Sequence, residues 1–134
     1  MHPNLLSVAR GYLGTPFHHQ GRVKGVGVDC AGFLVCIAKD LGYPVEDLGV
    51  YDHDPDPVVL RKYLEKQLVI EFMTNRTIGN IVLMDLGNSR WGHHLGLLTD
   101  IGIIHALASA RKVVETTLDQ QLDRSIVGVY SWPN

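Results

Sequence analysis

The segment Gly25–Leu41, which reads GVGVDCAGFLVCIAKDL, constrains this chain more than any other. Glycines precede Asp29, and apolar residues then recur at helical spacing. Asp29 is a favourable N-cap residue and Gly42 a favourable terminator, so the sequence predicts a helix that begins at Cys30. In its first turn, free backbone N–H groups and the positive end of the helix dipole stabilise a thiolate. We therefore expect Cys30 to have a lowered pKa and to act as a nucleophile.

A second interpretation of the same cysteine stays open at this point. Cysteine is among the most frequently buried residue types, so Cys30 can equally be a small core residue. Cys36 lies about 600° further around the same helix and would face another side. This spacing fits neither a disulfide framework nor a C-x-x-C motif, and we interpret Cys36 as a core residue.

Composition narrows the class of protein. The chain has 134 residues, 46% hydrophobic and 19% charged, which predicts a single domain over residues 1–134 with a proper core. A net charge of −2 and no long run of like charge argue against a nucleic-acid partner. The N-terminal sequence has neither a signal-peptide pattern nor a membrane-spanning stretch, so we expect synthesis in the cytoplasm and no membrane partner.

Helical patterns occupy the first half of the chain and β-like patterns the second half. Helices are expected at residues 3–13, 30–41 and 57–68, with loops at 17–29, 43–57 and 86–92. Strands are expected at 81–84, 94–99, 101–107, 112–117 and 126–132, with a helical turn at 118–123. Short links favour antiparallel pairing, so we predict an α+β fold with N-terminal helices on a sheet of about five strands.

Two of the seven histidines lie within predicted strands. His94 shares a face with Gly96, and His105 lies on the following strand. A tight turn between these strands would place the two imidazoles side by side, and Gly96 would allow the Cys30 helix to approach. Cys30 would then attack a carbonyl, His94 would act as base and acid, and His105 would orient His94. Backbone N–H groups at the helix start would face the oxyanion.

Zinc is the rival chemistry for these residues. Cys30, His94, His105 and His19 together have suitable ligand atoms, but no pair has a close ligand spacing such as C-x-x-C or H-x-x-x-H. We therefore expect no metal and no cofactor. A fold in which the histidines are only buried structural residues is the third interpretation.

Four motifs in this order, GTPFHHQG, GVDCAGFL, HLGLL and IIHA, resemble the NlpC-type cell-wall cysteine peptidases. These are small enzymes with a papain-like fold, and the resemblance runs from Leu5 to the C-terminus. It implies Cys30 as nucleophile, His94 as base and His105 as third residue. His19 stands where many members have a tyrosine near the oxyanion.

The resemblance also implies a substrate and a setting. The substrate would be peptidoglycan stem peptide, cut through a thioester between D-γ-glutamyl and a diamino acid. Asp29, Arg22 or Lys24 would read its charged groups. The stretch 22–29 and the ending VGVYSWP resemble the branch found in phage and prophage tails, which implies tail proteins as partners and a phage particle as location. Two alternatives remain: a structural tail component with little turnover, or an acyltransferase or amidase using the same triad.

Overall fold

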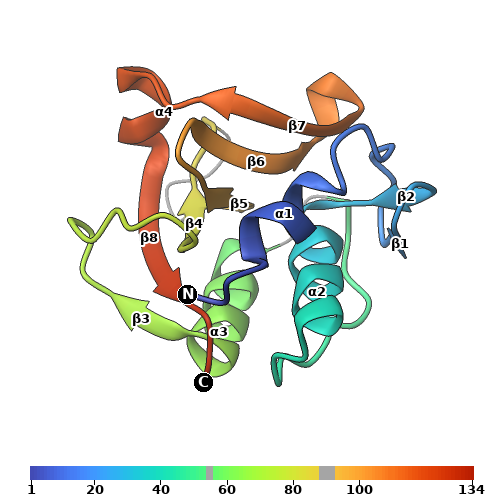
Figure 1. The fold of residues 1–134 in the computed structure, drawn as a ribbon, viewed down its shortest axis with the longest axis horizontal. Coiled ribbons are helices and arrows are strands. Elements are labelled where there is room, and N and C mark those ends of the chain that lie inside the picture. Colours follow the sequence, from blue (N-terminus) through green and yellow to red (C-terminus); the bar gives the residue numbers. More distant parts are fainter. Residues whose placement is uncertain (54–55, 88–92) are drawn as a thin grey trace.

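The computed structural model describes residues 1–53, 56–87 and 93–134 (Figure 1). Its helices are α1 (Leu5–Arg10), α2 (Cys30–Leu41), α3 (Pro57–Gln67) and α4 (Gln120–Ser125), with a 3₁₀ turn η1 (Ala108–Ala110). Its strands are β1 (Arg22–Val23), β2 (Gly27–Val28), β3 (Val69–Glu71), β4 (Ile81–Met84), β5 (His94–Leu98), β6 (Gly102–Leu107), β7 (Lys112–Thr117) and β8 (Ile126–Ser131).

In the part of the chain that the structure describes, six strands form one antiparallel sheet in the order β3-β8-β4-β5-β6-β7, while β1 and β2 pair separately. This confirms the predicted α+β fold, although the sheet has six strands where about five were expected. The sequence did not predict β3, because Val69 and Ile70 are both exposed and this three-residue edge strand has no alternation of buried and exposed residues. β1 and β2 lie in a glycine-rich segment that reads as a loop.

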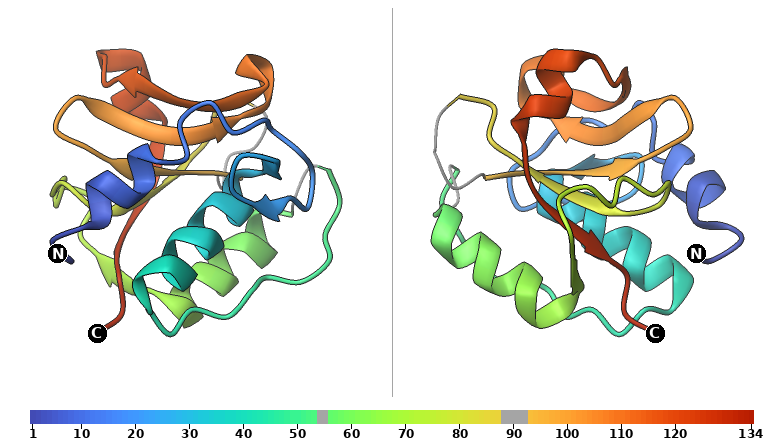
Figure 2. Two further views of the ribbon diagram at one scale, coloured as in Figure 1. Left: turned by 45° about the vertical axis from the view of Figure 1, so that its right-hand side comes forward. Right: turned by 90° about the vertical axis from the view of Figure 1, so that its left-hand side faces the viewer.

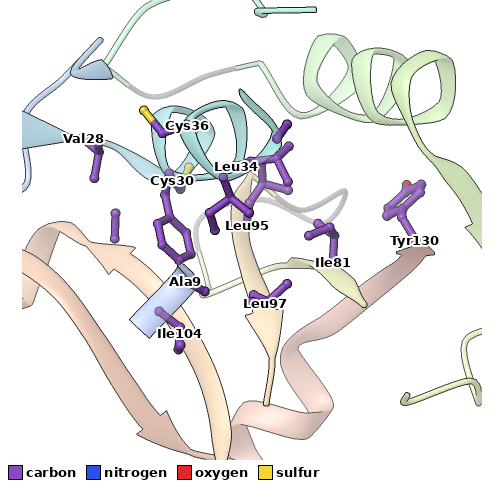
Figure 3. Close-up of a cluster of buried hydrophobic side chains, with 14 of the residues drawn as sticks. Ala9, Val28, Cys30, Leu34, Cys36, Ile81, Leu95, Leu97, Ile104 and Tyr130 are labelled. Carbon is purple, nitrogen blue, oxygen red and sulfur yellow. The ribbon is translucent and has the colours of Figure 1, made fainter. Parts of the chain in front are cut away.

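The helices cover the two faces of a curved sheet unequally. Figure 2 shows α2 and α3 against one side of the sheet and α4 beyond the other. On the first side, Leu34 of α2 packs towards Leu95 and Leu97 of β5 in the larger apolar core (Figure 3). A smaller core lies on the α4 side, built from Val82, Met84, Leu98, Ile103, Ile126 and Val129. Burial of this apolar surface is the main stabilising contribution to the fold.

The helix that carries Cys30 forms as predicted. The Asp29 side chain caps it by accepting a hydrogen bond from the Gly32 amide at 2.8 Å. Gly42 ends it with a φ of 76°, a conformation that glycine adopts without strain. Cys36 is buried in the larger core, which confirms its predicted structural role. The Asp56 side chain caps α3, again as predicted.

The remaining boundaries deviate in small ways. α1 spans Leu5–Arg10 and is shorter than the predicted 3–13, and the predicted turn at 118–123 is the helix α4 at Gln120–Ser125. The predicted loops 43–57 and 86–92 include residues 54–55 and 88–92, which lie outside the described residues. Within the part of the chain that the structure describes, no helix combines the length and apolar content needed to cross a bilayer.

Candidate active site

β5 and β6 pair only next to their shared turn. The described residues pair Leu97 with Ile104 and Leu98 with Ile103, whereas β6 continues to Leu107 along β7. The Leu98 amide donates to the carbonyl of Asn80, just before β4, and since amides alternate in direction along a strand, the Leu95 amide points away from β4 and towards β6.

The Leu95 amide lies near the Cys30 sulfur, where it lowers the pKa of the thiol, and the two residues line the same small cavity. The first turn of α2 therefore meets β5 at the residue that follows His94.

The electrostatics of Cys30 differ from the sequence expectation. Burial and, to a smaller extent, the neighbouring Asp29 carboxylate raise the pKa of the Cys30 thiol to about 11. Hydrogen bonds from the amides of Leu95, Ala31 and Cys30 itself act in the opposite direction but are outweighed. The predicted lowering of this pKa is therefore wrong for the free protein, because desolvation and a like charge exceed the effect of the helix N-terminus. Cys30 rests as a neutral thiol.

The two strand histidines are in contact, as the strand pattern predicts. His94 Nε2 lies 2.8 Å from His105 Nδ1, and both rings are buried. Gly96 is required on this face, since a Cβ there would lie 2.5 Å from Ile103 Cγ2. The expected reason for this glycine, close approach of the Cys30 helix, is wrong: its neighbours are Ile103 and Met84, on the side of the sheet opposite α2.

The histidine contact extends to a third residue, Thr116 of β7. Its Oγ1 lies 2.8 Å from His105 Nε2. The sequence analysis missed Thr116, because nothing in the β-branched segment KVVETT distinguishes one threonine before the β6–β7 register is known. If each ring donates outward, His94 Nε2–H bonds to His105 and His105 Nε2–H bonds to Thr116. This assignment leaves the lone pair of His94 Nδ1 to accept a proton.

Burial keeps both imidazoles uncharged. Desolvation lowers the pKa of His94 to about 3, with further contributions from His105 and His93, and lowers that of His105 to about 4. At neutral pH both rings are therefore uncharged. Among the described residues no hydrogen bond joins the Cys30 sulfur to His94, and such bonds are often long in enzymes without substrate.

Asp29, predicted to lie at the cleft, is a buried junction of four hydrogen bonds. One oxygen accepts from the Gly32 amide at 2.8 Å and from Arg22 Nη1 at 3.2 Å. The other accepts from the Gln20 amide at 2.9 Å and from the Tyr51 hydroxyl. The carboxylate thus fixes the start of α2 and ties two loops to it. Tyr51, which no sequence signal identified, joins the site through this bond.

The two predicted basic residues have internal contacts. Arg22 donates two hydrogen bonds to the Asp47 carboxylate, from Nε at 2.9 Å and from Nη2 at 3.0 Å. Its Nη2 also donates to the Tyr51 hydroxyl at 3.1 Å. The Lys24 ammonium lies 5.4 Å from the centre of the Tyr12 ring, a cation–π contact. Arg22 therefore acts in the same network as Asp29.

His19 lies at the rim of this network. Its ring stacks on His53 with centroids 4.0 Å apart and meets the edge of the Tyr51 ring at 5.4 Å. The ring is half-buried. The structure thus brings His19 to Tyr51, and Tyr51 to the residue that caps the Cys30 helix.

The candidate zinc ligands are not arranged as a set. Within residues 1–53, 56–87 and 93–134, no group of three or more His, Cys, Asp or Glu side chains has the geometry to hold a metal ion. His94 Nε2 and His105 Nδ1 also face each other at 2.8 Å, so these two nitrogens are bonded to one another.

Comparison with known proteins places the fold. No protein-family model matches the sequence, and no curated protein is significantly similar to it. Among solved structures, an NLP/P60 family protein from Staphylococcus aureus superposes over 95% of this chain with a TM-score of 0.68 and 14% identity. An NlpC/P60 family protein from Bacillus cereus covers 94% with the same TM-score and 21% identity. The NlpC/p60 domain of the peptidoglycan hydrolase SagA covers 95% with a TM-score of 0.67 and 18% identity.

These similarities define the fold of the chain as that of NlpC/P60 proteins. The match spans 39% and 38% of the lengths of the S. aureus and B. cereus proteins, but 95% of the SagA domain. The predicted NlpC-type, papain-like α+β fold is thereby confirmed.

Proposed function

We propose that this protein is a cysteine hydrolase that cleaves amide bonds in peptidoglycan stem peptides. Its fold is shared with peptidoglycan hydrolases, among them SagA and, over 98% of the chain with a TM-score of 0.56, RipB of Mycobacterium tuberculosis. The observation that carries the proposal is the 2.8 Å hydrogen bond between His94 and His105, formed next to the strand residue that contacts Cys30.

The first half-reaction follows from the resting protonation states. The Cys30 thiol gives its proton to His94 Nδ1 as the sulfur attacks the carbonyl carbon, because neither group is ionised beforehand. His105 stabilises the imidazolium by accepting the hydrogen bond from His94 Nε2–H. The C–N bond then breaks, the leaving amine takes the proton from His94, and a thioester on Cys30 remains.

The second half-reaction regenerates the enzyme. Water gives a proton to His94 and adds to the thioester carbonyl; the C–S bond then breaks, and the sulfur recovers the proton. The amides of Cys30 and Ala31 at the start of α2 stabilise the oxyanion in both halves. His19, at the rim beside Tyr51, acts as a further donor or as a wall of the cleft.

The finer assignment rests on the motif resemblance. We propose that the bond cut lies between D-γ-glutamyl and a diamino acid, that residues 1–134 act as one domain, and that the protein is carried by a phage or prophage tail. The stretch 22–29 and the ending VGVYSWP support the phage branch.

Digestion of purified peptidoglycan, with fragments identified by mass, tests this function. The wild type should release fragments that end in D-glutamate, and Cys30→Ala should release none while keeping its fold. Cys36→Ser is the matched control and should retain activity, since this thiol packs in the core.

Two results would contradict hydrolysis. No release by the wild type, together with stable binding to a tail protein, would identify a structural component. Transfer of the acyl group to an added amine in preference to water would identify an acyltransferase.

A further inference from the structure

Gln20 belongs to a segment that packs directly on the first turn of α2. The Gly21 carbonyl comes so close to this turn that a Cβ at Gly32 would lie 2.0 Å from its oxygen. The Gln20 amide donates a hydrogen bond at 2.9 Å to the carboxylate of Asp29, which caps the helix. The backbone at Gln20 therefore supports the turn whose amides are proposed to stabilise the oxyanion.

The side chain of Gln20 binds a second segment, the loop that follows α2. Figure 2 shows this loop running back alongside the helix towards its start. The Gln20 Nε2 donates to the Gly49 carbonyl at 3.1 Å, and its Oε1 accepts from the Tyr51 amide at 2.8 Å. Because a carboxamide has both a donor and an acceptor, one side chain fixes the backbone of the loop at two points.

The backbone conformation of Gln20 is one that glycine adopts more readily. Its φ is 63°, in the left-handed region where residues other than glycine are uncommon. A residue held in this region is strained, and such strain persists only where the surrounding contacts outweigh it. The two hydrogen bonds to the loop are contacts of this kind, and they depend on the glutamine side chain.

These hydrogen bonds position Tyr51. Its amide is bonded to Gln20, and its hydroxyl donates to the Asp29 carboxylate and accepts from Arg22 Nη2 at 3.1 Å. Tyr51 is thus fixed both at its backbone and at the tip of its side chain. A continuous path of hydrogen bonds leads from the Gln20 carboxamide through Tyr51 to the carboxylate that caps α2.

We propose that Gln20 is a positioning residue: it holds Tyr51 against Asp29 and thereby fixes the first turn of α2, which carries Cys30 and the oxyanion amides. The benefit to catalysis rests on the proposed hydrolase function. The fixing of the turn itself can be measured without turnover.

Hydrogen exchange of the Gly32 amide, followed by NMR on the intact protein, tests the effect on the turn. This amide donates to Asp29 at 2.8 Å, so its exchange rate reports how often the first turn opens. Gln20→Gly should make the exchange about tenfold faster, because the two hydrogen bonds to the loop are lost. The variant should keep the native fold, since glycine adopts this φ without strain. An unchanged exchange rate would overturn the proposal.

A double-mutant cycle tests whether Gln20 acts through Tyr51. Tyr51→Phe should also speed the exchange of the Gly32 amide, and adding Gln20→Gly to it should have no further effect, because both changes break one path. Effects that multiply in the double variant would overturn the proposal. Gln67→Ala is the matched control and should exchange as wild type does. Its carboxamide accepts from the Glu46 amide at 2.9 Å, in the same loop but away from Tyr51.

Turnover of a soluble muropeptide separates this proposal from the function itself. Gln20→Gly should lower kcat about tenfold and leave KM within about twofold, because the first turn of α2 is proposed to act on the transition state. A wild-type kcat in this variant would overturn the positioning role and keep the hydrolase. No cleavage by the wild type, with Gly32 exchange that still depends on Gln20, would overturn the hydrolase and keep the link between Gln20 and the turn.

Discussion

The two sides of the candidate active site are held by different kinds of interaction. On the cysteine side, Asp29 is a charged junction that binds Arg22, Tyr51 and backbone amides. On the histidine side, the buried rings of His94 and His105 and the half-buried Thr116 form a hydrogen-bonded chain without formal charge. The pKa of the Cys30 thiol is raised on the cysteine side, and the pKa values of His94 and His105 are lowered on the histidine side. Both effects keep the proton on the sulfur. The comparison teaches that a charged network and an uncharged one can favour the same resting state, a neutral thiol beside neutral imidazoles.

The largest expected effect comes from removing the base. His94→Gln should lower kcat by about 10²–10⁴-fold, the usual contribution of a general acid–base, because His94 is the proposed acceptor of the thiol proton. Peptide cleavage measures it, and near-ultraviolet circular dichroism checks that the fold is kept. Activity within a few-fold of wild type would show that the histidine side is structural.

The uncharged character of the histidine side has a consequence for acid stability. The pKa values of His94 and His105 in the folded state, about 3 and 4, lie below the ordinary value near 6.5. As the pH falls below about 6.5, the unfolded chain binds two protons that the folded chain does not, so the free energy of unfolding falls by up to about 2.7 kcal/mol per pH unit. The loss levels off once the folded-state pKa values are reached, and above pH 6.5 the two rings contribute no slope.

Urea unfolding between pH 7 and 4.5 measures this slope. His105→Gln should reduce it by about 1.4 kcal/mol per pH unit, the value for one proton. His18→Gln, at an exposed ring, should leave it unchanged. A flat profile in the wild type would show that the imidazoles are charged in the folded protein.

A smaller effect is expected on the cysteine side. Asp29→Asn keeps a hydrogen-bonding cap but removes the negative charge, so the pKa of Cys30 should fall by about one unit and alkylation by iodoacetamide should become about tenfold faster. The rate is measured against pH in a Cys36→Ser background. Slower alkylation, or none, would show that burial alone sets the reactivity of the thiol.

Much of the scaffold could be predicted from the sequence because its signals are local. Asp29 and Gly42 determined the ends of α2, and β-branched residues determined β7. His94 and His105 were predicted to meet because strand periodicity and a short turn are sufficient to align them.

The parts that could not be predicted depend on distant contacts. Tyr51 reaches Asp29 through the path of a loop, and Thr116 reaches His105 through the register between two strands. The state of the Cys30 thiol depends on burial, which sequence position at a helix start does not reveal.

Arg22 forms ion pairs with both Asp47 and Asp29, and these limit how the length of the loop around Asp47 can change. Surface loops ordinarily accept insertions and deletions. Here a change of length between Asp47 and Tyr51 would shift partners of the carboxylate that orients the first turn of α2. Loop grafting intended to alter which peptides are accepted should therefore leave these anchor points in place and diversify the stretch outside them.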